Sequence, residues 1–236
     1  MLLALERAAS AAFDVTSFIS DADAALYRQL APEVGQRVQV IPNGVDTVYW
    51  DPSLPFESPF ATGSRPIVFT GAMDYWPNGD AVHWFATEVL GRVRARLPQA
   101  QFCIVGSNPS RQVTELAAIP GVTVTGRVPD VRPYLAHAGA VVAPLRVARG
   151  TQNKVLEAYA MARPVVLTSA AANGLIPAPF MAGSIHDDPQ TMAEGVCQAL
   201  AAAPRFDAAR QYVIERFSWD YAFTLLDQAM QLDLAG

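Results

Sequence analysis

Three residues suited to a phosphorylated ligand follow one another at intervals of three, Thr151, Lys154 and Glu157. In a helix this spacing places their hydroxyl, ammonium and carboxylate groups on one face. The first backbone amides of such a helix lack intrahelical partners and favour an anion; here they are the amides of Gln152, Asn153 and Lys154. The set fits a phosphate beside a sugar diol. Lys154 and the amides would bind the phosphate, and Glu157 would accept hydrogen bonds from two hydroxyls.

The same residues also have a simpler interpretation, in which Thr151 caps the helix and Lys154 and Glu157 form a weakly stabilising exposed pair. The spacing alone leaves both interpretations open. Gly150 follows the apolar run 140–145, and Pro164 opens a further strand after the helix has ended. In an open α/β sheet, such a loop lies in the crevice outside the carboxyl ends of the strands.

The elements that must position these residues alternate regularly. Strands are predicted at 66–70, 101–106, 122–126, 140–144 and 164–167, and a last strand at 183–186, separated by helices at 80–97, 111–118 and 130–137 and by a three-turn helix between Thr151 and Pro164. Short apolar strands alternating with helices predict the α/β class, here a Rossmann-like parallel sheet with helices on both faces. Helices at 189–202, 206–217 and 219–234 complete the chain, with Ser218 capping the last.

The first part of the chain has a different organisation. We predict a helix at 1–12, a strand at 16–20, a helix at 22–30 capped by Ser20 or Asp21, and a strand at 38–41. Two strands and so few helices cannot bury a sheet face alone. We therefore expect 1–41 to be the remnant of a second α/β domain, 42–65 a linker, 66–205 the main domain and 206–236 helices that cross back to the first domain.

Composition excludes several classes of function. The chain has 236 residues and a formal net charge of −5, with scattered signs, which argues against a nucleic-acid partner. Cys103 and Cys197 stand apart from any Cys/His cluster, so no metal site is expected. No apolar run reaches the roughly 18 residues needed to span a bilayer, and the first residues carry charge too early for a secretory signal. These features indicate a cytoplasmic protein.

Two segments together resemble a known family. The segment 150–166 reads G-x-x-x-K-x-x-E-A-x-A-x-x-x-P-V-V, and 41–46 reads IPNGVD. Both are similar to the glycosyltransferase family four enzymes, retaining transferases of the GT-B fold. The resemblance implies that Glu157 holds the nucleotide ribose and that the amides at the helix start hold the diphosphate. It also implies that this chain is the C-terminal, donor-binding half. An N-terminal acceptor domain of about 120 to 170 residues would then precede Met1.

The resemblance extends to other loops at strand ends. In related enzymes, the loop that contains Arg127 and Val128 contacts the nucleotide base through main-chain groups; the alternative is a tight turn with an exposed arginine. Gly71 and Met73 follow the strand 66–70 in a second candidate loop, although a single glycine after a strand is weak evidence. Many family members have a glutamate that touches the donor sugar where this chain has Arg149. Either the sugar is held differently, as an acidic sugar or with Arg149 on the diphosphate, or the member is impaired.

The aromatic pair Tyr75 and Trp76 could line a pocket or cover the sheet edge. In the final helix, Trp219, Phe223, Leu226 and Met230 would leave an apolar stripe exposed if no acceptor domain covered it.

The resemblance implies transfer of a sugar from a nucleoside diphosphate to a glycan or lipid-linked acceptor, with no cofactor. Because the helix start and Lys154 would supply positive charge to the leaving diphosphate, the transfer is expected to be metal-independent, and no catalytic residue is assigned. The segments PNGDAVHWF, VGSNPS and GTQNKVLEAYAM resemble a subgroup of exopolysaccharide transferases, some of them associated with exosortase systems. Membrane contact at the inner face would come through the acceptor domain.

The alternative is a noncatalytic nucleotide-sugar-binding or partner module. An NAD-dependent enzyme is disfavoured because the Gly-x-Gly-x-x-Gly fingerprint is absent.

Overall fold

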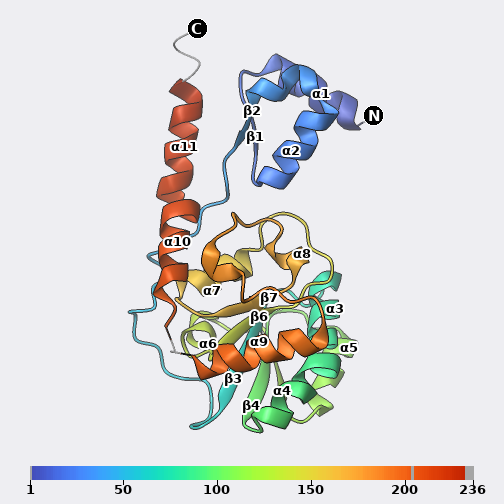
Figure 1. Ribbon diagram of the computed structural model, residues 1–236, viewed down its shortest axis with the longest axis vertical. Helices are drawn as coiled ribbons and strands as arrows, with labels where there is room; N and C mark the ends of the chain where they lie inside the picture. Colours follow the sequence, from blue (N-terminus) through green and yellow to red (C-terminus); the bar gives the residue numbers. More distant parts are fainter. Residues whose placement is uncertain (1, 203–204, 232–236) are drawn as a thin grey trace.

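The computed structural model describes residues 2–202 and 205–231. The described part contains a five-stranded sheet and a two-stranded sheet, both parallel (Figure 1). The strands are β1 (Thr16–Phe18), β2 (Val38–Val40), β3 (Arg65–Thr70), β4 (Ala100–Val105), β5 (Val122–Gly126), β6 (Ala140–Ala143) and β7 (Val165–Leu167). The α-helices are α1 (Leu2–Ala12), α2 (Asp21–Leu30), α3 (Trp76–Trp84), α4 (Leu90–Arg96), α5 (Arg111–Glu115), α6 (Arg132–Ala136), α7 (Asn153–Ala160), α8 (Ser169–Ala172), α9 (Pro189–Ala201), α10 (Asp207–Phe217) and α11 (Trp219–Gln231).

The main sheet has the strand order β5-β4-β3-β6-β7. Ile67 in the central strand β3 pairs with Phe102 of β4 on one side and with Ala140 of β6 on the other. All four residues of β6 are buried, as expected for a parallel strand covered on both faces. The chain runs outward from β3 to β5 and then crosses back to β6 beside β3. The strand order therefore reverses between β3 and β6, which is where α/β sheets bind ligands.

Helices cover both faces of the sheet. Right-handed crossovers place α3, α4 and α5 on one face and α6 and α7 on the other, because the chain progresses in opposite directions on the two sides of the reversal. Helix α9 packs on β6, β7 and α4, while α7 packs between the sheet and α10 (Figure 1). The predicted α/β class with a helix-flanked parallel sheet is confirmed.

The small N-terminal unit has its own core. It consists of β1, β2, α1, α2 and a 3₁₀ segment (η1, Pro32–Arg37), and its buried cluster is separate from the main core. Ser20 caps α2 as predicted, because its Oγ accepts a hydrogen bond from the Asp23 amide at 3.2 Å. The linker returns to the C-terminal helices, where the Val45 amide donates to the Phe217 carbonyl at 2.6 Å.

Arg210 on α10 ties the linker to the end of α7. Its guanidinium donates to the Trp50 carbonyl at 2.7 Å and to the Ala160 carbonyl at 2.6 Å. Ser218 separates α10 from α11 and caps the second helix, as predicted, by accepting a hydrogen bond from the Tyr221 amide at 3.1 Å. The predicted end of this helix at 234 lies outside the described residues. The apolar stripe on α11 is exposed, with Trp219, Phe223, Leu226 and Met230 between 40% and 55% accessible.

Two predicted elements differ from the structure. The helix expected at 80–97 begins earlier, at Trp76, because Pro77 occupies a first-turn position where its missing amide costs nothing. It also contains a π-helical segment (η2, Phe85–Val89) between α3 and α4. The predicted strand at 183–186 is wrong. Only Ile185 forms a bridge, with Leu167 at the end of the three-residue strand β7.

Candidate functional site

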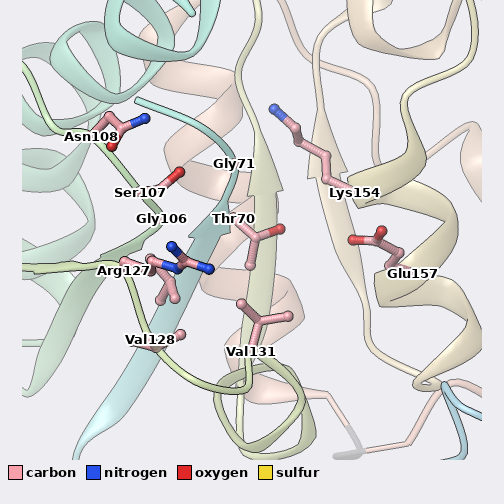
Figure 2. Close-up of a pocket in the computed structure, with 11 residues that line it drawn as sticks. Thr70, Gly71, Gly106, Ser107, Asn108, Arg127, Val128, Val131, Lys154 and Glu157 are labelled. Atoms are coloured by element: carbon pink, nitrogen blue, oxygen red, sulfur yellow. The ribbon is translucent and has the colours of Figure 1, made fainter. Parts of the chain in front are cut away.

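A cleft of about 540 Å³ opens at the carboxyl ends of the strands, at the point where the strand order reverses. It is bounded by the loops after β3, β4 and β5 and by the first turns of α7 (Figure 2). The lining residues are Thr70, Gly71, Val105, Gly106, Ser107, Asn108, Arg127, Val128, Val131, Lys154 and Glu157. The predicted residues Gly71, Arg127, Val128, Lys154 and Glu157 are therefore brought together around one space.

Backbone contacts hold the loops that bound this cleft. The Met73 amide donates to the Ser107 carbonyl at 2.8 Å, and the Gly71 amide to the Val105 carbonyl at 3.1 Å. Gly106 is required by the close approach, since a Cβ there would lie 1.6 Å from the Gly71 carbonyl oxygen. The β3 and β4 loops therefore form one connected backbone surface.

The first turn of α7 presents free donors. Gln152 is the N-cap residue, and its side chain donates to the Arg149 and Gly150 carbonyls instead of capping the helix. Within the described residues, no protein acceptor is hydrogen-bonded to the backbone amides of Gln152, Asn153 or Lys154. These amides remain available to an anion.

Thr151 does not cap the helix, contrary to our prediction. Its Oγ1 donates to the Gly174 carbonyl at 3.0 Å, and so it fixes the preceding loop. Gly174 lies directly against this loop, because a Cβ there would lie 2.4 Å from the Gly150 carbonyl carbon and oxygen. The Thr151 hydroxyl, which the sequence placed on the ligand face, therefore holds the loop, and no side chain caps the start of α7.

Lys154 lies at the Gly71 end of the cleft (Figure 2). Its ammonium donates to Asn78 Oδ1 and lies 4.4 Å from the centroid of the Phe69 ring, a cation–π contact. Burial lowers the pKa of Lys154 to about 8, and the nearby Glu157 carboxylate opposes this shift. Lys154 is also the single lysine of the chain, whose other basic side chains are arginines and histidines.

Glu157 points into the cleft one turn after Lys154, opposite Arg127 (Figure 2). Burial raises the pKa of the Glu157 carboxyl, and Lys154 opposes the shift. Within the described part of the chain, the carboxylate accepts no hydrogen bond and forms no ion pair. Because burying an ionised carboxylate is costly without donors, this acceptor suits a ligand that brings hydroxyl groups.

Thr70 was missed by the sequence reasoning. It ends β3 on the floor of the cleft and is only 5% exposed, yet its hydroxyl has no hydrogen-bond partner in the described part of the chain. A buried polar group without a partner costs about 1 to 3 kcal/mol, so the hydroxyl is a candidate ligand contact. Its position as the last, polar residue of an apolar strand was the signal available in the sequence. Ser107, Asn108 and Val131 were also missed.

Other predicted residues lie outside the cleft lining. Met73 is 2% exposed and belongs to the main core. Arg149 and Asn153 are exposed, and Gly150 has φ of 62° in the loop before α7. Arg149 therefore does not line the cleft, and its role stays a prediction.

Of the two roles suggested for Tyr75 and Trp76, covering the sheet edge is not observed, whereas Trp76 does line a pocket. Their side chains are 58% and 61% exposed, so they do not cover the sheet edge, and neither lines the cleft. Trp76 instead lines a separate groove between α3 and α5.

Two features are absent from the described part of the chain. No group of three or more histidine, cysteine, aspartate or glutamate side chains is arranged to hold a metal ion. None of the helices in residues 2–202 and 205–231 combines the length and the apolar character needed to cross a membrane.

Solved structures with the same fold include several glycosyltransferases. A glycosyltransferase from Rickettsia africae is 14% identical, with a TM-score of 0.70 over 92% of this chain and 63% of its own. Anabaena HepE, solved with UDP and glucose, is 16% identical, with a TM-score of 0.66 over 93% and 62%. Sucrose-phosphate synthase from Thermosynechococcus elongatus is 22% identical, with a TM-score of 0.69 over 99% and 62%. At these identities the likeness shows the fold alone.

The chain spans about three fifths of the length of these solved structures. No curated protein sequence matches it. The family model described as glycosyl transferases group 1 matches residues 64–202, which is more than half of the chain and includes every residue that lines the cleft. The chain therefore belongs to the group 1 glycosyltransferases.

Proposed function

We propose that this chain is the donor-binding part of a retaining glycosyltransferase that transfers a sugar from a nucleoside diphosphate to a glycan or lipid-linked acceptor. One observation carries the proposal. The Lys154 ammonium and the unpartnered Glu157 carboxylate line one cleft at the reversal of the strand order, and the helix α7 that carries both begins with amides that have no protein acceptor among the described residues. Membership of the group 1 family supports a sugar-transfer role for that cleft.

The charges of the cleft suit the chemistry of such a transfer. When the bond between sugar and diphosphate breaks, negative charge accumulates on the leaving diphosphate. The amides at the start of α7 carry the positive end of the helix dipole, and Lys154 adds a full charge beside them. Because these groups supply the positive charge themselves, we propose that donor binding does not depend on a divalent metal.

Glu157 is placed to orient the nucleotide. It follows Lys154 by one helical turn, so a diphosphate on the amides would bring the adjoining pentose to the carboxylate. The two ribose hydroxyls would donate to it and compensate its burial. Arg127 and Val128 stand on the opposite wall, where the base would lie (Figure 2). HepE, solved with UDP and glucose, shares this fold and supports a nucleotide ligand of this class.

Binding is tested by calorimetric titration of the chain with UDP, GDP and NAD. We expect saturable binding of UDP or GDP and no comparable binding of NAD, because the glycine fingerprint of dinucleotide sites is absent. A folded chain that binds neither nucleoside diphosphate would overturn the proposal.

Catalysis needs a second experiment. The chain is assayed for sugar transfer alone and with an N-terminal acceptor domain supplied from a related enzyme, and the anomeric configuration of the product is determined by NMR. A retained configuration is expected. Nucleotide-sugar binding without transfer under either condition would favour a noncatalytic binding module, in which the exposed Arg149 replaces the usual sugar-contacting glutamate. The further proposal of a role in exopolysaccharide synthesis rests on the segment resemblance alone.

A further inference from the structure

The chain uses its single lysine at the cleft and arginine for the sixteen other strong cations. The two side chains differ in a way that matters here. Arginine stays charged in proteins, whereas burial readily shifts the protonation of a lysine. Among the residues that line the cleft, Lys154 is the only cationic side chain on the α7 side. A contact that sets the position and charge of Lys154 therefore controls the positive charge on this wall.

Asn78, in the first turn of α3, makes such a contact. Its side chain is nearly fully buried, the residue being 5% exposed. Its Nδ2 donates to the Ala72 carbonyl at 2.9 Å, and its Oδ1 accepts a hydrogen bond from the Lys154 ammonium. The amide therefore joins the loop after β3 to the start of α7, which are two separate walls of the cleft.

The surroundings leave little freedom at this junction. A Cβ on Gly71 would lie 2.8 Å from Asn78 Nδ2 and 3.2 Å from Lys154 Nζ, so the loop, the amide and the ammonium are in mutual contact. Asn78 in turn is fixed by its own backbone, whose amide donates to the Tyr75 carbonyl at 2.9 Å.

We propose that Asn78 is a positioning residue that holds the Lys154 ammonium in place for an anion while leaving its charge uncompensated. This inference rests on the proposed function, because the anion is taken to be the diphosphate of the donor. A neutral amide orients the ammonium without neutralising it. An aspartate of the same shape would form a buried ion pair and compete with the ligand.

The charged groups around Lys154 support this assignment. From its own helix, Glu157 faces it. From β3 the neutral Phe69 ring and Thr70 hydroxyl lie nearby, from α3 comes neutral Asn78, and across the cleft stands the cationic Arg127. Among the described residues, Glu157 is therefore the one carboxylate of the cleft lining. It does not fully offset burial, since the pKa of Lys154 is lowered to about 8.

A pH dependence follows, with a defined sign. Below pH 8 the ammonium is charged and available to the diphosphate; above it, the free protein loses the proton and must recover it to bind. Affinity for UDP should therefore fall as the pH rises through about 8. Binding near this pH should be accompanied by proton uptake, which calorimetry in two buffers of different ionisation enthalpy measures.

The test uses the single lysine as a reporter. In protein labelled with ¹³C-lysine, the one side-chain signal gives the pKa of Lys154 directly by pH titration, without ligand. Three variants are compared with the parent, N78D, N78A and V82A. Val82 is fully buried in the same helix and does not line the cleft, so V82A controls for a general loss of packing in α3.

We expect N78D to raise the pKa of Lys154 toward or above its ordinary value of 10.5 and to weaken UDP binding. N78A should leave the pKa at about 8 or lower it, and weaken UDP binding about tenfold through the lost orientation. V82A should change neither property. Lysine pKa values and UDP affinities that are the same in parent, N78D and N78A would overturn the inference.

The two proposals fail in distinguishable ways. If the parent binds neither UDP nor GDP, the proposed function fails, while the lysine titration of the ligand-free variants still tests the role of Asn78. If the parent binds UDP but N78A binds it equally well, the nucleotide site stands and the positioning role is refuted.

Discussion

Replacement of Glu157 by alanine separates a ligand-binding carboxylate from a structural one. Burial raises the pKa of Glu157 above its unfolded value, so the ionised form at pH 7 is disfavoured in the folded protein. The sign follows from linkage. The free energy of unfolding of the parent increases as the pH falls through the raised pKa of Glu157. Above this pKa, the charged carboxylate destabilises the folded state. The carboxylate has no hydrogen-bond donor among the described residues, so its removal breaks no protein hydrogen bond. We expect the variant to be at least as stable as the parent in urea.

Although Glu157→Ala should not lower the stability of the protein, it should weaken UDP binding. Loss of two hydrogen bonds from the ribose hydroxyls costs roughly 1 to 3 kcal/mol, which corresponds to about 5- to 150-fold weaker UDP binding. Calorimetry measures this loss. Glu88→Ala is the matched control, because Glu88 is an exposed glutamate on η2 that does not line the cleft.

A ligand that lacks the diol completes the test. With 2′,3′-dideoxyuridine diphosphate, the parent should lose a similar amount of affinity, whereas Glu157→Ala should bind this analogue and UDP almost equally. A folded Glu157→Ala that binds UDP like the parent would refute the reasoning. So would an equal penalty for the missing diol in both proteins.

Three further changes have expected outcomes. Thr70→Val should raise the free energy of unfolding in urea by about 1 kcal/mol, because it removes a buried unpartnered hydroxyl, and should weaken UDP binding; lower stability with unchanged binding would contradict this. Gly174→Ala should destabilise the protein by about 1 to 3 kcal/mol and weaken UDP binding, because the new methyl displaces the Gly150 backbone before α7; parent-like values of both would show that the loop yields. Ser218→Ala should cost about 0.5 to 2 kcal/mol of stability through the lost cap on Tyr221 and leave UDP affinity unchanged; an unchanged urea midpoint would argue against the cap.

Periodicity predicted the main sheet because its physical cause is local. The apolar run of β6 and the glycine and proline signals around α7 each report burial or a turn within a few residues. The segment 183–186 shows the limit of such patterns. Its apolar Ile185 suggested a strand, but a strand also needs a partner long enough to pair with, and β7 ends at Leu167.

The site was predictable where one helix carried it. Lys154 and Glu157 share a face because of helical spacing alone, which the sequence displays directly. The cap was not predictable from the same pattern, because Thr151 bonds to Gly174, a contact between residues 23 positions apart. Asn78 was missed for the same reason, since its role depends on the packing of α3 against the first turn of α7, 76 positions further along. Thr70 was missed because only the folded structure shows that its buried hydroxyl has no hydrogen-bond partner among the described residues.

The central claim is that the start of α7 receives a diphosphate. Titration of ¹⁵N-labelled protein with UDP tests it most directly, through the backbone amide signals of Gln152, Asn153 and Lys154. We predict saturable shifts at these three amides, larger for UDP than for uridine, because the diphosphate supplies the acceptors that the protein lacks there. If UDP binds and these signals stay in place while others move, or if no nucleoside diphosphate moves them in the folded protein, the account is contradicted.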